Sequence, residues 1–113
     1  MAGQHDGGTG TIVLGATVEQ FRRVKKDGTK AAAAEADVGT TLQRGDSGEA
    51  VGLSFKNKQG TTLMVGNAAI ADGADVFAAA DGKVAPAGTI NVGIAWAACA
   101  GDDAVFEVMR NGS

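Results

Sequence analysis

The stretch Asp75-Val-Phe-Ala-Ala-Ala-Asp-Gly-Lys-Val84 decides the fold, because it has the pattern of a strand, a tight turn and a second strand. Its Asp81-Gly82 pair favours a hairpin, since the turn needs positive φ angles, which these residue types tolerate. The first half of the chain has the same plan, where Asp27-Gly28 precedes Val38-Gly39 at the same interval as Asp81-Gly82 precedes Val92-Gly93. The sequence therefore predicts one hairpin around each Asp-Gly pair.

Two explanations of this internal similarity remain open at the level of sequence. A Gly-Asp pair follows each copy, at Gly45-Asp46 and Gly101-Asp102, but its distance from the preceding Val-Gly pair is longer in the second copy. The chain is either a duplication of one unit or a recurrence of the same local turn chemistry.

Two segments have helical alternatives. Thr17 and Gln20 form a capping-box pattern, and Val18, Phe21 and Val24 recur at helical spacing. We favour the hairpin for residues 18–26 because they run into the first Asp-Gly pair. Residues 31–37 are rich in alanine, the best helix former, and could form two helical turns.

Short apolar segments bounded by glycine indicate further strands. They lie at residues 11–14, 50–55, 61–65, 89–96 and 104–109. In the fourth of them, Ile90, Val92, Ile94 and Trp96 alternate with smaller residues, which predicts that all four share one face. The expected fold is all-β with room for one short α-helix, arranged as a small β-barrel or β-sandwich.

Size and composition fit one domain, residues 11–113, preceded by a glycine-rich arm, residues 1–10, that we expect to be flexible. The 113 residues include 18 glycines and only five aromatic side chains, so the monomer should be modestly stable. No apolar run is long enough for a membrane span, and the N-terminus lacks the form of a signal peptide. A single cysteine, Cys99, fits synthesis in a reducing cytoplasm.

The motifs that suggest chemistry have simpler structural explanations. Gly45-Asp-Ser-Gly48 spells the nucleophile turn of chymotrypsin-like proteases, but the one histidine, His5, lies in the arm. We interpret the motif as a polar turn. One histidine is too few for a metal site, and no glycine pattern fits a phosphate loop. We expect no enzymatic activity, no metal and no cofactor.

The second half of the chain resembles the capsid decoration, or cement, proteins of tailed bacteriophages. The resemblance is carried by Gly73-Ala-Asp-Val-Phe-Ala-Ala-Ala-Asp-Gly-Lys-Val-Ala-Pro86, then Val92-Gly-Ile-Ala-Trp96, then Gly101-Asp-Asp-Ala-Val-Phe-Glu-Val108. A weaker similarity extends upstream to Gly48, so that the resemblance covers well over half of the chain. This chain differs from the family in its N-terminus and in the bulky Trp96, where the family usually has a small or acidic residue.

The resemblance implies a β-tulip-like domain on the outer surface of a phage capsid, made in the host bacterial cytoplasm. It implies binding to the major capsid protein, often as homotrimers at threefold or quasi-threefold positions, with stabilisation of the shell. From the residues themselves, we expect neither a membrane nor a nucleic acid as a partner. The basic run at residues 21–26 has one aromatic residue, too few for a nucleic-acid stacking platform.

Two sets of residues follow as candidates for contacts. The arm and the basic run supply the candidates for capsid contact, which are Gln4, His5, Asp6, Thr9, Arg22, Arg23, Lys25 and Lys26. Larger apolar side chains are candidates for the core or a subunit interface, and these are Phe55, Met64, Trp96 and Met109. An alternative function is a small carbohydrate- or ligand-binding β-domain in which Trp96 stacks on the ligand.

Overall fold

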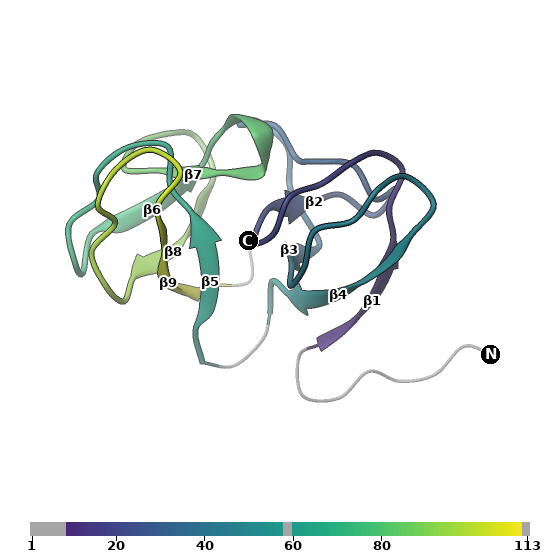
Figure 1. The fold of residues 1–113 in the computed structure, drawn as a ribbon. Helices are drawn as coiled ribbons and strands as arrows, with labels where there is room; N and C mark the ends of the chain where they lie inside the picture. The colour runs from purple at the N-terminus through teal and green to yellow at the C-terminus, as the bar shows by residue number, and fades with distance from the viewer. Residues whose placement is uncertain (1–8, 58–59, 112–113) are drawn as a thin grey trace.

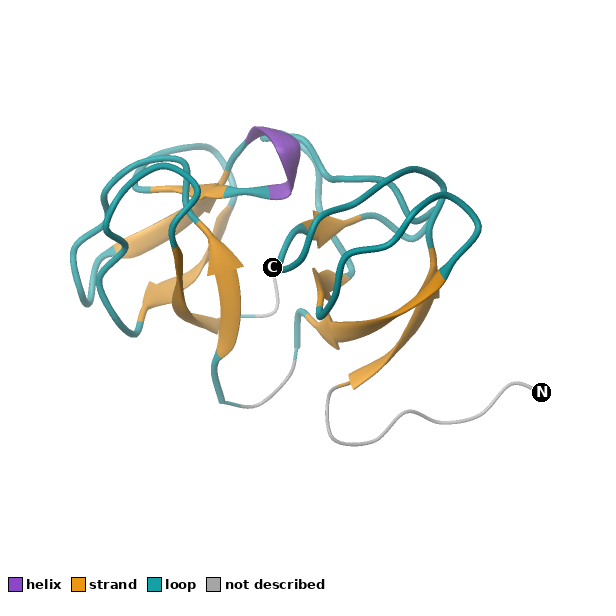
Figure 2. Ribbon diagram, in the orientation of Figure 1, coloured by secondary structure: helices purple, strands orange, loops and turns teal. Residues whose placement is uncertain are grey.

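The computed structural model describes residues 9–57 and 60–111, and within these ranges the chain forms two antiparallel sheets and no α-helix (Figures 1 and 2). The all-β expectation is confirmed. The N-terminal sheet has the order β1-β4-β3-β2 and the C-terminal sheet the order β5-β9-β8-β6-β7. The strands of the first are β1 (Thr9–Val13), β2 (Arg23–Val24), β3 (Gly39–Thr41) and β4 (Ala50–Phe55). Those of the second are β5 (Thr62–Val65), β6 (Asp75–Ala78), β7 (Val84–Ala85), β8 (Asn91–Ala95) and β9 (Val105–Arg110), with a 3-10 turn η1 (Ala80–Gly82).

The two sheets are two copies of one structure. In order along each sheet, β1, β4, β3 and β2 correspond to β5, β9, β8 and β6. The backbones of Val18 and Gly45 exchange two hydrogen bonds of 3.0 Å, and those of Ile70 and Cys99 exchange two of 3.1 and 2.8 Å. We call residues 9–57 the first repeat and residues 60–111 the second repeat.

The strand register gives the residue-by-residue correspondence of the repeats. Three residues lie side by side across each sheet: in the first they are Val24, Gly39 and Phe55, and in the second Val76, Gly93 and Arg110. The same row thus recurs with nearly the same spacing along the chain. The structure therefore favours a duplicated unit over chance recurrence of turn chemistry. The two Gly-Asp pairs are not equivalent to each other, because Gly45 corresponds to Cys99.

Both predicted hairpins form around the Asp-Gly pairs. At the second, Asp81 and Gly82 have φ angles of 59° and 71°, the pair of positive angles that an Asp-Gly hairpin turn requires. At the first, only Gly28 is left-handed, at 83°, and the Asp27 carboxylate accepts hydrogen bonds from the Thr29 backbone N–H at 3.0 Å and hydroxyl at 2.6 Å. The first turn is therefore of a different type and is held by the aspartate side chain.

Each repeat has its own hydrophobic core. The core of the first repeat contains Ile12, Leu14, Val18, Val24, Val51 and Leu53. The core of the second is larger and includes Met64, Ile70, Val76, Val92, Cys99, Phe106 and Val108. Each sheet curls over its core because its two edges meet at one end, where Gly15 donates to the Gly28 carbonyl at 3.1 Å and Asn67 to the Val84 carbonyl at 2.8 Å.

The helical alternative for residues 31–37 does not occur, and this segment is a loop. Its carbonyl groups accept hydrogen bonds from a side chain: the Arg23 guanidinium donates to the carbonyl oxygens of Ala31, Ala32 and Glu35 at 3.3–3.4 Å. The Glu35 carboxylate accepts the Ala32 N–H at 2.9 Å. A buried cation outweighs the helix propensity of alanine here.

The prediction that residues 90, 92, 94 and 96 share a face is also wrong. The register between β6 and β8 shifts between Val76 and Phe77, so β8 carries one extra residue. Beyond this bulge the alternation reverses. Val92 is therefore fully buried in the core, whereas Ile94 and Trp96 are 39% and 57% exposed on the outer face of the sheet.

Candidate interaction surfaces

A buried arginine joins the two repeats. Arg23, on β2, has no exposed surface, and its guanidinium donates to the carbonyl oxygens of Ala79 at 2.6 Å and Lys83 at 3.0 Å in the second repeat. Loss of hydration lowers the pKa of Arg23, and the charge of Asp37, 3.8 Å away, opposes that effect. Arg23 therefore fixes the second repeat on the outer face of the N-terminal sheet.

A second buried ion pair makes the connection in the opposite direction. Arg110, at the end of β9, makes a bidentate contact with the Asp37 carboxylate in the first repeat, at 2.6 and 2.9 Å. Both side chains are nearly inaccessible to water. Asp37 thus lies between two arginines, and its charge offsets part of the cost of burying both.

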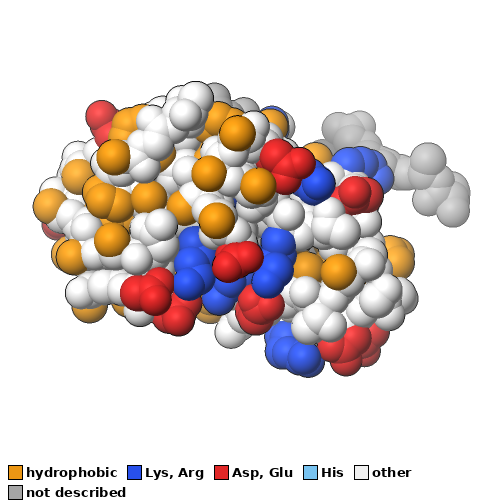
Figure 3. Space-filling model, turned by 90° about the horizontal axis from the view of Figure 1, so that it is seen from above, with side chains coloured by type: hydrophobic (Ala, Val, Ile, Leu, Met, Phe, Trp, Pro, Cys, Tyr) orange, Lys and Arg blue, Asp and Glu red, His pale blue; other side chains and the backbone are white. Residues whose placement is uncertain are grey.

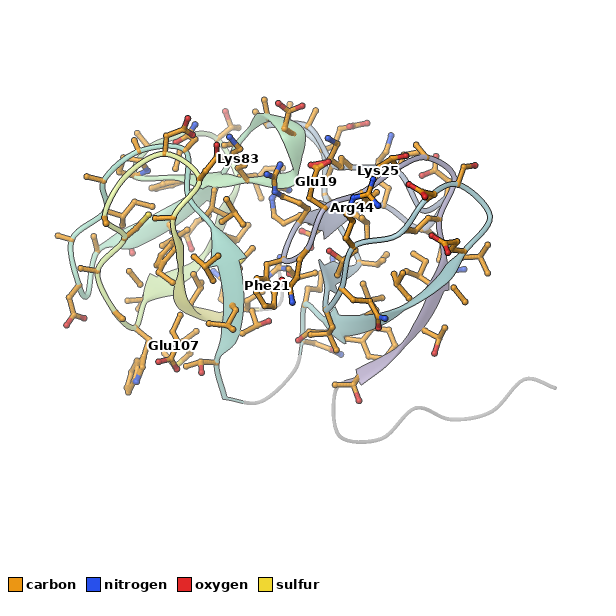
Figure 4. All side chains as sticks on the ribbon, viewed as in Figure 1. Glu19, Phe21, Lys25, Arg44, Lys83 and Glu107 are labelled. Carbon is orange, nitrogen blue, oxygen red and sulfur yellow. The ribbon has the colours of Figure 1, made fainter. Side chains whose placement is uncertain are left out.

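A network of more exposed charges covers the upper side of this junction. Figure 3 shows Lys and Arg side chains alternating with Asp and Glu there, and apolar side chains gathered over the second repeat. Glu19 and Lys83 lie at this junction in Figure 4. Arg22 contacts Glu19 at 3.2 Å and Asp103 at 3.7 Å, and Lys83 contacts Asp103 at 2.7 Å. The network is shared by the two repeats.

The Lys83–Asp103 pair predicts a small acid sensitivity. The hydrogen bond and the charge of Lys83 hold the pKa of Asp103 below its ordinary value of 3.8. The stabilisation is therefore present above that value and is lost as the pH falls through the lowered pKa. We expect Lys83→Met to lower the melting temperature slightly at pH 7 and hardly at all at pH 2, with Lys56→Met as the control. Equal losses at both pH values in thermal unfolding would contradict this.

The outer face of the C-terminal sheet carries several exposed apolar side chains. Ile94 and Met109 are direct neighbours across β8 and β9, each 39% exposed. Trp96, Leu63 and Val105 extend the same face. Glu107, whose position Figure 4 shows, lies among them and accepts a hydrogen bond from the Thr61 hydroxyl at 2.7 Å. We call this surface the apolar face; a contiguous exposed apolar surface of this kind marks a contact site.

The first repeat has an open groove beside its core. The groove has a volume of about 280 Å³ and is lined by Thr11, Ile12, Lys26, Val38, Leu53 and Phe55. Five of these side chains present apolar atoms, and Lys26 brings a positive charge to the rim. Lys26 is exposed and forms no ion pair within the described part of the chain.

The structure distributes the predicted capsid contacts unevenly. Lys26 and Thr9 are exposed, Lys25 pairs with Glu35 at 3.1 Å, and Arg22 is largely enclosed in the charge network. Arg23 is a correction, because complete burial leaves its side chain no surface for a direct contact. The other three candidates, Gln4, His5 and Asp6, lie outside the described residues.

The apolar candidates also separate. Met64 is buried in the core of the second repeat, while Phe55 is half-buried at the groove. Trp96 and Met109 are on the apolar face, so they do not belong to the core of this chain. Sequence reasoning missed Asp37 and Arg110, which are 73 residues apart and carry no local signal of their pairing.

The motifs that suggested chemistry take ordinary structural roles. Asp46–Glu49 form a turn in which Glu49 donates to the Asp46 carbonyl at 3.0 Å, as the polar-turn interpretation predicts. Across residues 9–57 and 60–111, no three His, Cys, Asp or Glu side chains converge as metal ligands do. In the same residues no helix has the length and apolar character to cross a membrane.

Comparison with known proteins gives a likeness in fold. No family model matches the sequence, and no curated protein matches it either. Among solved structures, the chain is similar to the N-terminal base of the head fiber protein gp8.5 of bacteriophage phi29. The TM-score is 0.74 at 15% sequence identity, over 93% of this chain and 94% of that one. The chain therefore has the fold of a phage head protein along nearly its whole length.

Proposed function

We propose that this protein is a structural component of a phage virion that binds the outer surface of the icosahedral capsid and stabilises it. The observation that carries the proposal is the shared fold with the base of a phage head fiber, over nearly the full length of both chains. The proposed role is that of a decoration protein whose partner is the major capsid protein. It requires binding and rigidity and no catalytic step.

The sequence supports the same proposal independently of the fold. The segments from Gly73 to Pro86, from Val92 to Trp96 and from Gly101 to Val108 resemble decoration proteins, and they form the hairpin β6–β7 and the strands β8 and β9. These elements build the C-terminal sheet, whose outer side is the apolar face. The part of the chain that resembles the family thus carries the apolar face.

We further propose that the protein acts as a homotrimer at threefold or quasi-threefold positions. Each repeat has a small core, in a chain rich in alanine and glycine, so neighbours that cover apolar surface add stability that the single chain lacks. A symmetric cluster also binds a shell by several weak contacts at once, which raises the avidity without any tight single contact.

The decisive experiment is attachment to bare heads. Purified protein is mixed with undecorated phage heads and the particles are imaged by electron cryomicroscopy, with bovine serum albumin as the matched control. We expect added density outside the shell at fixed lattice positions, and a higher temperature of genome release. Heads without added density, in low salt and at saturating protein, would overturn the proposal.

The capsid contact is proposed to involve the N-terminal residues, including Gln4, His5 and Asp6. Thr9 belongs to β1 and pairs with Ser54 of β4. The contact is therefore tested by deleting residues 2–8, which leaves the strand intact. We expect the deletion to weaken attachment to heads at least tenfold while the melting temperature is unchanged. Undiminished attachment would remove the arm from the contact.

One observation favours a second candidate function, the binding of a carbohydrate. Trp96 is 57% exposed, and an exposed indole ring stacks on sugar rings. A glycan array distinguishes the two functions. Glycan binding that is lost in Trp96→Ala, together with no attachment to heads, would replace the decoration role by this one.

A further inference from the structure

The second repeat covers one row of residues on the first. Arg23, Thr40 and Ser54 lie side by side across β2, β3 and β4 on the outer face of the N-terminal sheet. All three are at most 1% exposed. The second repeat buries them, since Arg23 donates to its backbone and the Thr62 hydroxyl donates to the Ser54 hydroxyl at 3.1 Å.

The same row in the second repeat is exposed within the described part of the chain. The residues that correspond to Arg23, Thr40 and Ser54 are Asp75, Ile94 and Met109, which lie side by side across β6, β8 and β9. Asp75 is exposed, and so are Ile94 and Met109. The row is mostly apolar, where its buried counterpart is polar. Of the two equivalent surfaces, the one in the first repeat is therefore buried and its copy in the second repeat is exposed. We call the exposed copy, formed by Asp75, Ile94 and Met109, the open row.

The surface of the second repeat that packs on the first repeat also has a counterpart in the first repeat. In the second repeat, the parts that cover the first are the turn at residues 79–83, Thr62 and Arg110. Their counterparts in the first repeat are the turn at residues 25–29, Gly10 and Phe55. Phe55 and Lys26 of this set line the groove of about 280 Å³. The groove thus stands where the covering surface of the first repeat would be.

The contact between the repeats joins two different surfaces. Arg23 of the first repeat donates to the 79–83 turn, whereas its counterpart Asp75 is exposed and forms no hydrogen bond or ion pair with the corresponding 25–29 turn within the described residues. A contact of this kind is head-to-tail and leaves one complementary surface unused at each end.

We propose that the open row of one copy docks into the groove of a second copy of this chain, repeating between molecules the contact that the two repeats make within one. Ile94 and Met109 then enter the apolar groove formed by Ile12, Leu53 and Phe55. Asp75 takes the place of Arg23 and approaches the 25–29 turn, which carries the unpaired Lys26. The two surfaces are therefore complementary in polarity and in charge.

A head-to-tail contact repeats until the assembly closes. Three copies give a ring of six repeats. Around this ring, contacts between repeats of the same chain alternate with contacts between repeats of neighbouring chains. This inference rests on the trimer in the proposed function, but not on attachment to a capsid. It assigns Lys26 to the contact between copies and leaves capsid contact to the N-terminal residues.

The first test uses light scattering coupled to gel filtration over a concentration series. We expect a mass three times the 11.2 kDa of one chain. Ile94→Lys should reduce the mass to that of the monomer, while the far-ultraviolet circular dichroism spectrum stays that of the folded chain. Val105→Lys is the matched control, because Val105 is 49% exposed on the same face but corresponds to Ala50, which the second repeat leaves exposed. A monomeric wild type, or equal effects of the two variants, would overturn the proposal.

The second test separates a head-to-tail contact from a self-complementary one. Thr11→Arg blocks the groove and leaves the open row, whereas Ile94→Lys blocks the open row and leaves the groove. Each variant alone should be monomeric, and an equimolar mixture should give a species of twice the monomer mass. If the open row instead packs on the open row of a second copy, Thr11→Arg alone still forms a dimer and the mixture gives no further complex, which would refute this arrangement.

The charges give a third, independent readout. Asp75→Lys should weaken the trimer at low salt by at least tenfold in dissociation constant, and adding Lys26→Glu should restore it. Failure of the double variant to recover would exclude the Asp75–Lys26 contact. Attachment of monomeric Ile94→Lys to bare heads is measured separately, so the decoration role and the ring contact can fail independently.

Discussion

Replacing Asp37 by alanine is expected to lower the free energy of unfolding by about 3–5 kcal/mol. The change takes the Asp37 carboxylate away from two buried arginines: Arg110, which contacts both of its oxygens, and Arg23, which is 3.8 Å away. The remaining positive charges repel one another in an interior that water does not reach. Because natural domains have only about 5–15 kcal/mol of stability, this variant should be largely unfolded at moderate temperature.

Chemical denaturation monitored by the fluorescence of Trp96 measures this effect. Asp72→Ala is the control, since Asp72 is exposed and makes no ion pair among the described residues; it should change the stability by less than about 0.5 kcal/mol. A second comparison distinguishes loss of the charge pair from loss of shape. Replacing both Asp37 and Arg110 by leucine should cost less than Asp37→Ala alone, because only Arg23 then lacks the Asp37 charge. Equal costs would show that the ion pair does not determine the effect.

Replacing Gly93 by alanine is expected to cost about 1–3 kcal/mol or more. A methyl group at Gly93 would overlap the backbone carbonyl of Met109 on the neighbouring strand. The corresponding glycine of the first repeat, Gly39, faces the backbone carbonyl of Ser54 in the same way. A backbone atom in a sheet cannot rotate aside as a side chain does, so the two strands must separate locally.

The measurement is urea unfolding of Gly93→Ala and Gly39→Ala beside Gly101→Ala. Gly101 has open space around it and no left-handed backbone, so alanine there should be neutral or stabilising by about 0.4–1 kcal/mol. The two strand variants should behave alike, because the repeats share this close approach. If Gly93→Ala is as stable as the wild type, the close approach of Gly93 to the Met109 carbonyl does not require glycine.

Local chemistry was readable from the sequence. The Asp-Gly pairs, the apolar segments between glycines and the polar turn at Gly45–Gly48 each depend on neighbouring residues, and the structure has hairpins, strands and a turn there. The strand at residues 50–55 matches the expected range to the residue. The fold class followed because these signals recur along the whole chain.

The face of the sheet on which a side chain lies, and whether that side chain is buried, could not be predicted from neighbouring residues. A bulge of one residue turned Ile94 and Trp96 outward, and a single register shift leaves no mark on the alternation of residue types. The basic run has the composition of a solvated surface, yet Arg23 is enclosed because carbonyl groups from the loop at 31–37 and from the second repeat surround it.

The amino-acid sequence alone determined that this chain is a β-protein with two related hairpins, because turn geometry and strand pattern depend on residues a few positions apart. Only the tertiary structure decided that the two halves contact each other head-to-tail, with the row at Arg23 buried and the matching row at Asp75 exposed. The physical reason is distance along the chain. The partners that decide which of two equivalent surfaces is covered, such as Asp37 and Arg110, are 73 residues apart and meet only when both sheets have formed.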